Sequence, residues 1–168
     1  MIPSEPQIES IIYKPIGVIH SPFTNLAHMP IQPSSRASAT GSALILPAYQ
    51  AGLKDLEGFS HVILIYHLHR VTRCDLTVTP FLDREPRGVF ATRAPTRPNP
   101  IGLSVVRLLA VKAGELSLGN LDILDGAPLL DVKPYVPEFD QPEGSIRAGW
   151  LEAAQARART TRSDERFR

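Results

Sequence analysis

The segment from Gly88 to Gly102 constrains the fold of this chain more than any other stretch of its 168 residues. Between its two glycines lie three prolines, two arginines and an asparagine. Each proline fixes φ and removes a backbone donor, so the segment fits neither a helix interior nor a central strand. Arg93 and Arg97 therefore present their guanidinium groups from a stiffened loop. Such a loop is suited to holding an anionic or carboxylate-bearing ligand in one orientation.

Short apolar runs with turn residues between them make up most of the remaining chain. We expect strands over residues 11–20, 39–46, 61–69, 76–80, 101–113, 115–118, 121–124 and 129–135. The run 61–69 is apolar on both faces, which predicts a central, fully buried strand. One or two helical turns are expected over 47–56, and an alanine-rich helix from Trp150 to about Arg159. This succession of strands favours a barrel or folded sheet and not alternating strands and helices.

Composition narrows the function classes. The net charge of +1 does not indicate a strongly charged binding partner. A nucleic-acid binder with this charge would need a local basic patch. Cys74 is the only cysteine, which excludes an intrachain disulfide and favours a reducing compartment such as the cytoplasm. The N-terminus lacks a basic stretch followed by an apolar run, and no apolar run approaches about 18 residues. We therefore expect neither a signal peptide nor a membrane span.

Three histidines stand at alternate positions of the strand expected over 61–69. His61, His67 and His69 would point to one face, and a His-x-His pair on a strand is a geometry that metals use. No third-ligand signature or cysteine cluster accompanies them, so we expect no metal. The alternative is that His61 and His67 are hydrogen-bonded core residues. His69 precedes Arg70 at a strand end, where ligand-binding loops emerge, and is the better candidate for a ligand contact.

Two carboxylates stand three residues apart in the segment 121–128. Asp125 precedes Gly126 and is typical of the first residue of a turn. Asp122 is expected to cap a strand edge. Farther along, Asp131 and Lys133 share one face of a strand, which predicts a surface ion pair.

The block from Gly88 to Gly102 resembles the signature of the TsaA-like family, also called the TrmO family. That signature is Gly-x-Phe-x-x-Arg-x-x-x-Arg-Pro-Asn-Pro-Ile-Gly, and this chain fits it without a gap. Residues 16–22, 56–62, 121–128 and 131–135 also resemble the family in the family's order. The resemblance covers about residues 14–140. It implies a single-sheeted antiparallel or mixed β-barrel of about six or seven strands with short helices. A barrel domain over 1–140 and a C-terminal helix or tail over 141–168 are expected.

The resemblance also implies an activity. Family members are S-adenosylmethionine-dependent tRNA methyltransferases that methylate N6 of threonylcarbamoyl-adenosine next to the anticodon. They work as homodimers with the cofactor near the subunit interface. Longer bacterial members carry a C-terminal domain, so we expect this chain to be the short form. The expected cofactor contacts are Pro30, Ile31, Gln32, His69, Arg70, Arg93, Leu103, Asp125, Gly126, Ala127 and Pro128. Ile31 replaces the arginine that the family usually has at that position.

Roles within this site remain open at the level of sequence. Asp125 is the candidate for assisting proton loss from N6, with water as the alternative. Arg97 and Asn99 are expected to brace the loop or to contact RNA phosphate. The competing functions are methylation of a small molecule or another RNA by the same fold, and non-catalytic binding of S-adenosylmethionine. A metal-dependent hydrolase is the most remote reading.

Overall fold

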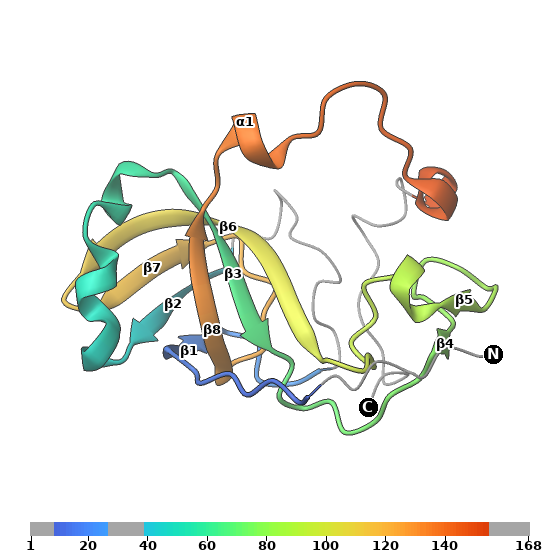
Figure 1. Cartoon of the computed structure of the whole chain (residues 1–168), viewed down its shortest axis with the longest axis horizontal. Helices are drawn as coiled ribbons and strands as arrows, with labels where there is room; N and C mark the ends of the chain where they lie inside the picture. The colour runs from blue at the N-terminus through green and yellow to red at the C-terminus, as the bar shows by residue number, and fades with distance from the viewer. Residues whose placement is uncertain (1–8, 27–38, 155–168) are drawn as a thin grey trace.

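A closed, six-stranded antiparallel barrel dominates the computed structural model, which describes residues 9–26 and 39–154 (Figure 1). Its strands are β1 (Gly17–His20), β2 (Thr40–Ile45), β3 (His61–His67), β6 (Ile101–Lys112), β7 (Glu115–Gly119) and β8 (Ala127–Pro134). Their order around the barrel is β1-β2-β7-β6-β3-β8, and β8 closes against β1. Every neighbouring pair is antiparallel. The expected mainly β barrel with short helices is confirmed.

Smaller elements flank the barrel. The strands β4 (Thr77–Val78) and β5 (Arg87–Gly88) form a separate two-stranded sheet. Short 3₁₀ helices cover Pro47–Leu53, Leu56–Gly58, Val89–Ala91 and Gly149–Ala154, and α1 covers Pro137–Asp140. The helical turns expected over 47–56 are confirmed. The helix expected from Trp150 is a 3₁₀ segment as far as residue 154, and its remainder lies outside the described residues. None of the described helices has the length and apolar character needed to cross a membrane.

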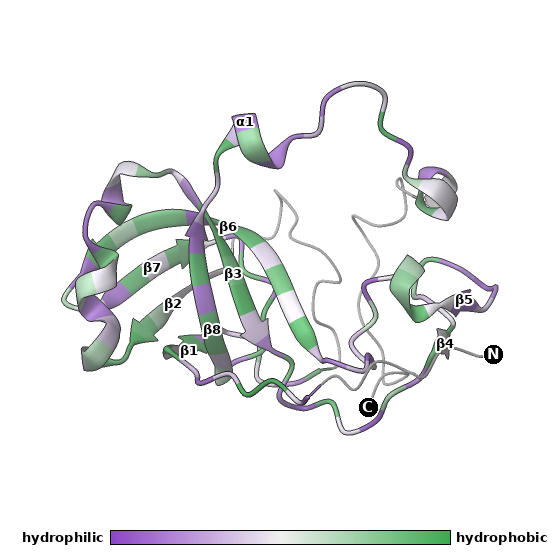
Figure 2. Ribbon diagram, viewed as in Figure 1, coloured by the Kyte–Doolittle hydropathy of each residue, from purple (hydrophilic) through white to green (hydrophobic). Residues whose placement is uncertain are grey.

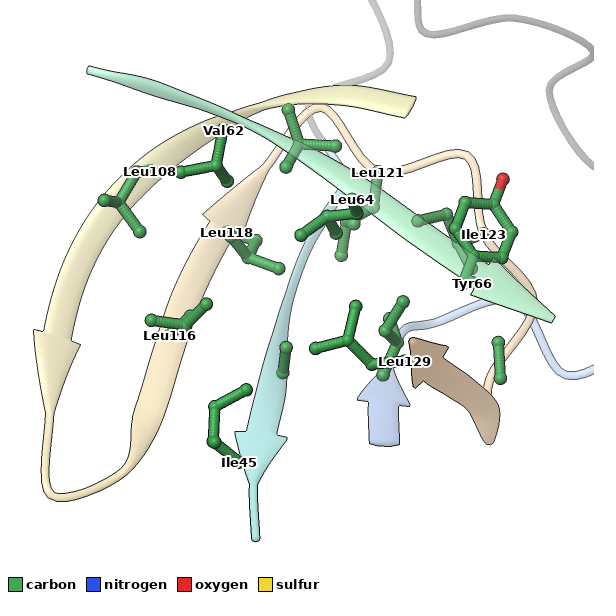
Figure 3. Close-up of a cluster of buried hydrophobic side chains, with 14 residues drawn as sticks. Ile45, Val62, Leu64, Tyr66, Leu108, Leu116, Leu118, Leu121, Ile123 and Leu129 are labelled. Carbon is green, nitrogen blue, oxygen red and sulfur yellow. The ribbon is translucent and has the colours of Figure 1, made fainter. Parts of the chain in front are cut away.

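The core fills the barrel interior, and each strand contributes one face to it (Figure 3). Along β3, Val62, Leu64 and Tyr66 point inward and are buried, whereas His61 and Ile63 on the other face are half-buried. The expectation of a fully buried strand is therefore wrong. A barrel strand has an interior and an exterior face, and here the exterior face also carries apolar residues. Figure 2 shows this mixture of hydrophobic and hydrophilic residues along the strands.

Two further expectations need correction. Residues 121–124 pair with no strand, although Leu121 and Ile123 are buried. The tight hairpin joins β6 to β7 instead, at Ala113 and Gly114, whose φ values of 50° and 81° suit a turn of this kind. Asn120 also has a positive φ, 61°, but it turns the chain out of β7 and across the barrel end. Residues 119 and 120 therefore form a turn but not a hairpin, because no strand follows at the expected 121–124.

The antiparallel order brings particular termini together. β1, β3 and β7 end where β2, β6 and β8 begin. We call this the site end of the barrel. It gathers His20, the residues following His67, and the segment 120–126, which connects β7 to β8. Most of the motifs singled out in the sequence lie here.

Candidate functional site

The segment 120–126 is anchored across the site end by both backbone and side chains. Leu121 and Ile123 insert into the core, each with 1% of its surface exposed. The hydroxyl of Ser21 donates to the carbonyl of Ile123 at 2.6 Å, and the Ser21 N–H donates to the Asp125 carboxylate at 3.0 Å. Since its neighbours on both sides point inward, Asp122 is partly exposed at the barrel end. The segment is therefore a fixed platform carrying two carboxylates.

Asp125 and Gly126 form the turn that the sequence predicted. Hydrogen bonding from the Ser21 N–H, with a smaller contribution from the His20 ring 3.4 Å away, lowers the pKa of Asp125 below its ordinary value. Gly126 has a φ of +77°, a conformation that residues with a Cβ adopt only with strain. A Cβ at Gly126 would stand 4.0 Å from Nε2 of His69. The structure thus brings the predicted turn and the predicted histidine side by side.

His69 lies just beyond the end of β3 and is partly buried. Burial lowers its pKa, the charges of Arg70 and His67 lower it further, and Asp125 opposes them. A lowered pKa keeps the imidazole neutral near pH 7. His61 stands at the opposite end of β3 on its outer face, where it bonds Ser60 at 2.9 Å. His61 and His67 are only partly buried on that outer face, so the core-histidine interpretation is wrong for both.

Metal binding finds no geometric support in the part of the chain that is described. Within residues 9–26 and 39–154, no three histidine, cysteine or carboxylate side chains gather as a metal would require. Asp131 and Lys133 form the surface ion pair that was expected, at 2.8 Å. That carboxylate is therefore engaged away from the site end.

The arginine loop is held by one of its own arginines. Nη1 of Arg97 donates to three carbonyls, those of Val89 at 3.2 Å, Thr92 at 2.9 Å and Ala94 at 3.4 Å. Its guanidinium carbon also lies 5.8 Å from the centre of the Phe90 ring. Arg97 thus braces the loop, one of the two roles expected for it. Asn99 is exposed, and its carbonyl accepts the Ile101 N–H at 2.7 Å, where the loop enters β6.

A second clamp comes from the C-terminal side of the chain. Nε1 of Trp150 donates to the carbonyl of Ala91 at 2.8 Å, and the guanidinium of Arg87 lies 6.0 Å from the centre of the indole ring. Ala91 is two residues from Arg93. The path that carries Arg93 is therefore fixed from both sides.

Arg93 contrasts with Arg97. Its side chain is exposed, and within the described ranges it makes no hydrogen bond or ion pair. Burial raises the pKa of Asp122 and of Tyr66, and the charge of Arg93 partly opposes both rises. The arginine loop and the 120–126 platform therefore lie at the same end of the barrel, where Arg93 is a cation with no hydrogen bond or ion pair among the described residues.

Sequence reasoning missed a buried polar row beside this cation. Ser104 donates to Asp122 at 2.8 Å, and the Tyr66 hydroxyl lies 3.1 Å from the Ser104 oxygen. Asp122 was expected to cap a strand edge, and the structure places it in this row instead. A signal was present, because Ser104 has the same inward-facing parity on β6 as Gly102 and Val106. A hydroxyl at an interior position of a barrel strand requires a partner.

The remaining predicted contacts are dispersed. Leu103 points away from the barrel interior and has 52% of its surface exposed. Ala127 is buried, and Pro128 is partly buried at the start of β8. Pro30, Ile31 and Gln32 lie outside the described residues. Among the described residues, His69, Arg70, Asp125 and Gly126 lie close together, and Arg93 acts on the same segment through Asp122.

Known proteins are similar to this chain over most of its length. A relative from Pyrococcus abyssi, named a probable S-adenosyl-L-methionine-binding protein, is 53% identical over 157 residues, which are 94% of this chain and 85% of the relative. The Escherichia coli tRNA (adenine(37)-N6)-methyltransferase is 38% identical over 89% of this chain and 67% of its own length.

Solved structures and a family model give the same result. A crystal structure of TrmO matches with a TM-score of 0.72 and 41% identity, over 83% of this chain and 64% of the solved chain. TrmO from Pseudomonas aeruginosa matches with a TM-score of 0.70, over 84% of this chain and 63% of the solved chain. This chain thus spans just under two thirds of each of these solved structures. The model of the tRNA-methyltransferase O N-terminal domain matches residues 18–141, so the chain belongs to that family.

Proposed function

We propose that this protein is an S-adenosylmethionine-dependent methyltransferase that modifies N6 of threonylcarbamoyl-adenosine next to the anticodon of tRNA. The relatives from Escherichia coli and Homo sapiens named tRNA (adenine(37)-N6)-methyltransferase support the reaction. The observation that carries the proposal is that the uncommitted Arg93 guanidinium acts on Asp122, which stands on the same 120–126 segment as the Asp125-Gly126 turn. One element offers a fork for a carboxylate, and the other offers backbone groups free of side-chain bulk.

The residues present suit the chemistry of S-adenosylmethionine, which supplies an electrophilic methyl group when bound. Arg93 would hold the carboxylate of its amino-acid portion. The backbone of Gly126, Ala127 and Pro128 would approach the adenine or ribose. His69 suits the same region because a neutral imidazole does not repel a sulfonium. Pro30, Ile31, Gln32, Arg70 and Leu103 complete the contacts that we propose.

Catalysis would rest chiefly on alignment. Methyl transfer is an in-line displacement, so holding donor and acceptor in line can supply most of the acceleration. Arg97 already donates to three loop carbonyls, and we assign it to fixing the loop on which Arg93 stands. Asn99 is exposed and remains available for an RNA phosphate. Asp125 keeps the two tasks expected for it, a cofactor contact and assistance to proton loss.

The outer surface of β6 supports the proposal of a homodimer. Ile101, Leu103 and Val105 point outward with 42%, 52% and 37% of their surfaces exposed. Ile65 of β3 lies opposite Leu103 and extends this apolar face across two strands. We propose that a second copy of the chain covers the face, because exposed apolar patches of this kind are typical of interfaces. Leu103 would then complete the cofactor site near the boundary of the two subunits.

The domain limits and the location are also proposals. We place the barrel domain over residues 1–140 and a C-terminal tail over 141–168. A tRNA substrate and a single, exposed cysteine favour the cytoplasm, where thiols stay reduced.

A methyl-transfer assay tests the proposed function. Purified protein is mixed with labelled S-adenosylmethionine and with tRNA that carries or lacks the threonylcarbamoyl group. Label in the modified tRNA alone is the expected result. Absence of label together with intact cofactor binding would overturn it.

A second candidate is binding of S-adenosylmethionine without tRNA methylation. The name of the Pyrococcus abyssi relative refers to binding, and Ile31 replaces an arginine that is usual in the family. Titration calorimetry with S-adenosylmethionine, combined with assays on unmodified tRNA and metabolite pools, separates a binding module from a methyltransferase with another acceptor.

A further inference from the structure

The hydrogen bonds in the polar row of Tyr66, Ser104 and Asp122 all run in one direction. Ser104 has one hydroxyl hydrogen, and Asp122 receives it. The Tyr66 hydroxyl must therefore donate to the oxygen of Ser104. Tyr66 and Ser104 are buried, with 6% and 3% of their surfaces exposed, whereas Asp122 is partly exposed. Both donors thus point along the row towards the one member that faces the site end.

The backbone around the row is adapted to it. Tyr66 of β3 lies opposite Gly102 of β6, and a Cβ at Gly102 would collide with the tyrosine ring. Figure 3 shows the ring beside Ile123, with its hydroxyl at the edge of the cluster of apolar side chains. Leu121 and Ile123 fix Asp122 between them through their burial in the core. The backbone of Asp122 is therefore held by the packing of its two neighbours, and its carboxylate is held by the hydrogen bond from Ser104.

A carboxylate at this position is not needed for the hydrogen bond. An asparagine would accept the same bond from Ser104 without placing a charge in a largely buried setting. Burial raises the pKa of Asp122, and the hydrogen bond from Ser104 and the charge of Arg93 only partly oppose the rise. A raised pKa strengthens a carboxylate as a proton acceptor. Asp125 has the opposite property, because its hydrogen bonds favour the ionised form.

We propose that Asp122 accepts the proton that leaves N6 during methyl transfer, and that Ser104 and Tyr66 are positioning residues behind it. This inference rests on the proposed function. In the step, a bond forms between N6 and the methyl carbon while the bond from that carbon to sulfur breaks and sulfur keeps the electron pair. The N6 proton passes to a carboxylate oxygen of Asp122. The products are the methylated base, S-adenosylhomocysteine and a protonated Asp122, which returns its proton to water.

The groups that act on Asp122 come from three elements. The uncharged Ser104 of β6 donates to Asp122, and Arg93 of the arginine loop acts on it by its charge. Tyr66 of β3 acts through its hydrogen bond with Ser104. Burial, with a smaller contribution from the Asp122 charge, raises the pKa of Tyr66 to about 12. Tyr66 therefore stays neutral over the range of an activity assay. At saturating S-adenosylmethionine, where protonation of His69 no longer limits cofactor binding, the acidic limb of the pH–rate profile then reports the Asp122 carboxylate.

The first test compares Asp122→Asn with the parent protein and with Asp131→Asn, a matched change in the surface ion pair of β8. We expect Asp122→Asn to lower the rate of methyl transfer at least about 100-fold, the lower range for general bases. Calorimetry should give a cofactor affinity within about threefold of the parent, because asparagine keeps the hydrogen bond to Ser104. Asp131→Asn should match the parent in both. A rate for Asp122→Asn within threefold of the parent would overturn the inference. Failure of the parent to methylate threonylcarbamoylated tRNA would instead overturn the proposed function.

The second test concerns the positioning residues. Ser104→Ala removes a bond that lowers the pKa of Asp122, so the acidic limb should move to higher pH. Tyr66→Phe keeps the bond between Ser104 and Asp122 and should move the limb less. A merely structural role for Ser104 would lower the melting temperature and leave the limb where it was, which would overturn the assignment.

Thermal melting as a function of pH tests the role of Asp122 without an activity assay and also shows whether the variant folds. Because the folded protein favours the protonated form of Asp122, its ionisation lowers stability as pH rises above about 4. Asp122→Asn should therefore melt at or above the parent temperature at pH 7, with the two temperatures converging towards pH 4. A variant that melts lower than the parent at pH 7 would show a structural carboxylate and contradict the proposal.

Discussion

Asp122 and Asp125 stand three residues apart on one anchored segment, and their carboxyl pKa values are displaced in opposite directions. Burial raises the pKa of Asp122, whereas the backbone N–H of Ser21 and the His20 ring lower that of Asp125. The difference arises because Asp122 adjoins the barrel interior while Asp125 lies at the turn. Two carboxylates of one motif are thus suited to different tasks.

Asp125→Asn should weaken the fold at neutral pH and not in acid. The lowered pKa means that ionised Asp125 stabilises the folded state above about pH 4, and that this stabilisation is lost as pH falls. The side chain is 38% exposed, so the expected loss at pH 7 is at most about 1 kcal/mol. Urea unfolding at pH 7 and pH 3 measures it. Equal differences at both pH values would contradict the assignment.

Arg93→Ala should lower cofactor affinity and leave folding intact. The guanidinium makes no hydrogen bond or ion pair within the described residues, so its removal deprives the fold of nothing found there. Loss of a charge-assisted contact should weaken S-adenosylmethionine binding by about 1.5–3 kcal/mol. Calorimetry and thermal melting report the two effects, and Arg147→Ala, at another exposed arginine, is the control. Unchanged affinity with a lower melting temperature would reverse the assignment.

Arg97→Lys, unlike Arg93→Ala, should lower the stability of the fold. A lysine ammonium cannot reproduce a planar group whose Nη1 lies within 3.4 Å of three carbonyls. We expect a loss of about 1–3 kcal/mol in unfolding free energy, with cofactor affinity falling as the loop under Arg93 loosens. A variant as stable as the parent would show that the three bonds contribute little.

Much of the fold and part of the site could be predicted from sequence for identifiable reasons. The prolines from Pro95 to Pro100 excluded regular structure, and the Gly126 turn followed from Asp-Gly chemistry. The row through Ser104 could not be found in the same way. Tyr66 and Ser104 are 38 residues apart in sequence, and only the antiparallel register of β3 and β6 brings them together. Burial of residues 61–69 was overestimated because an apolar exterior face looks the same in sequence as an interior one.

The affinity for S-adenosylmethionine should fall in mild acid through His69. Its pKa lies below the ordinary value of about 6.5, chiefly because of burial, so the ring is neutral at pH 7 and gains a proton as pH falls below that value. A positive ring beside the cofactor would repel its sulfonium. His69→Gln should keep a polar contact and flatten the dependence. Calorimetry from pH 5 to pH 8 checks this, and an identical slope in the variant would remove His69 from the site.

Leu103→Lys should separate the subunits and weaken cofactor binding together. Leu103 is 52% exposed at the centre of the apolar face of β6, where a charge would be buried against the second copy. Leu44→Lys is the matched control, since Leu44 is 46% exposed on β2, which does not adjoin β6. Light scattering should give a dimer for the parent and for Leu44→Lys, and a monomer for Leu103→Lys. Because Leu103 is proposed to complete the cofactor site, the monomer should also bind S-adenosylmethionine more weakly. A dimeric Leu103→Lys with parent affinity would place the interface elsewhere.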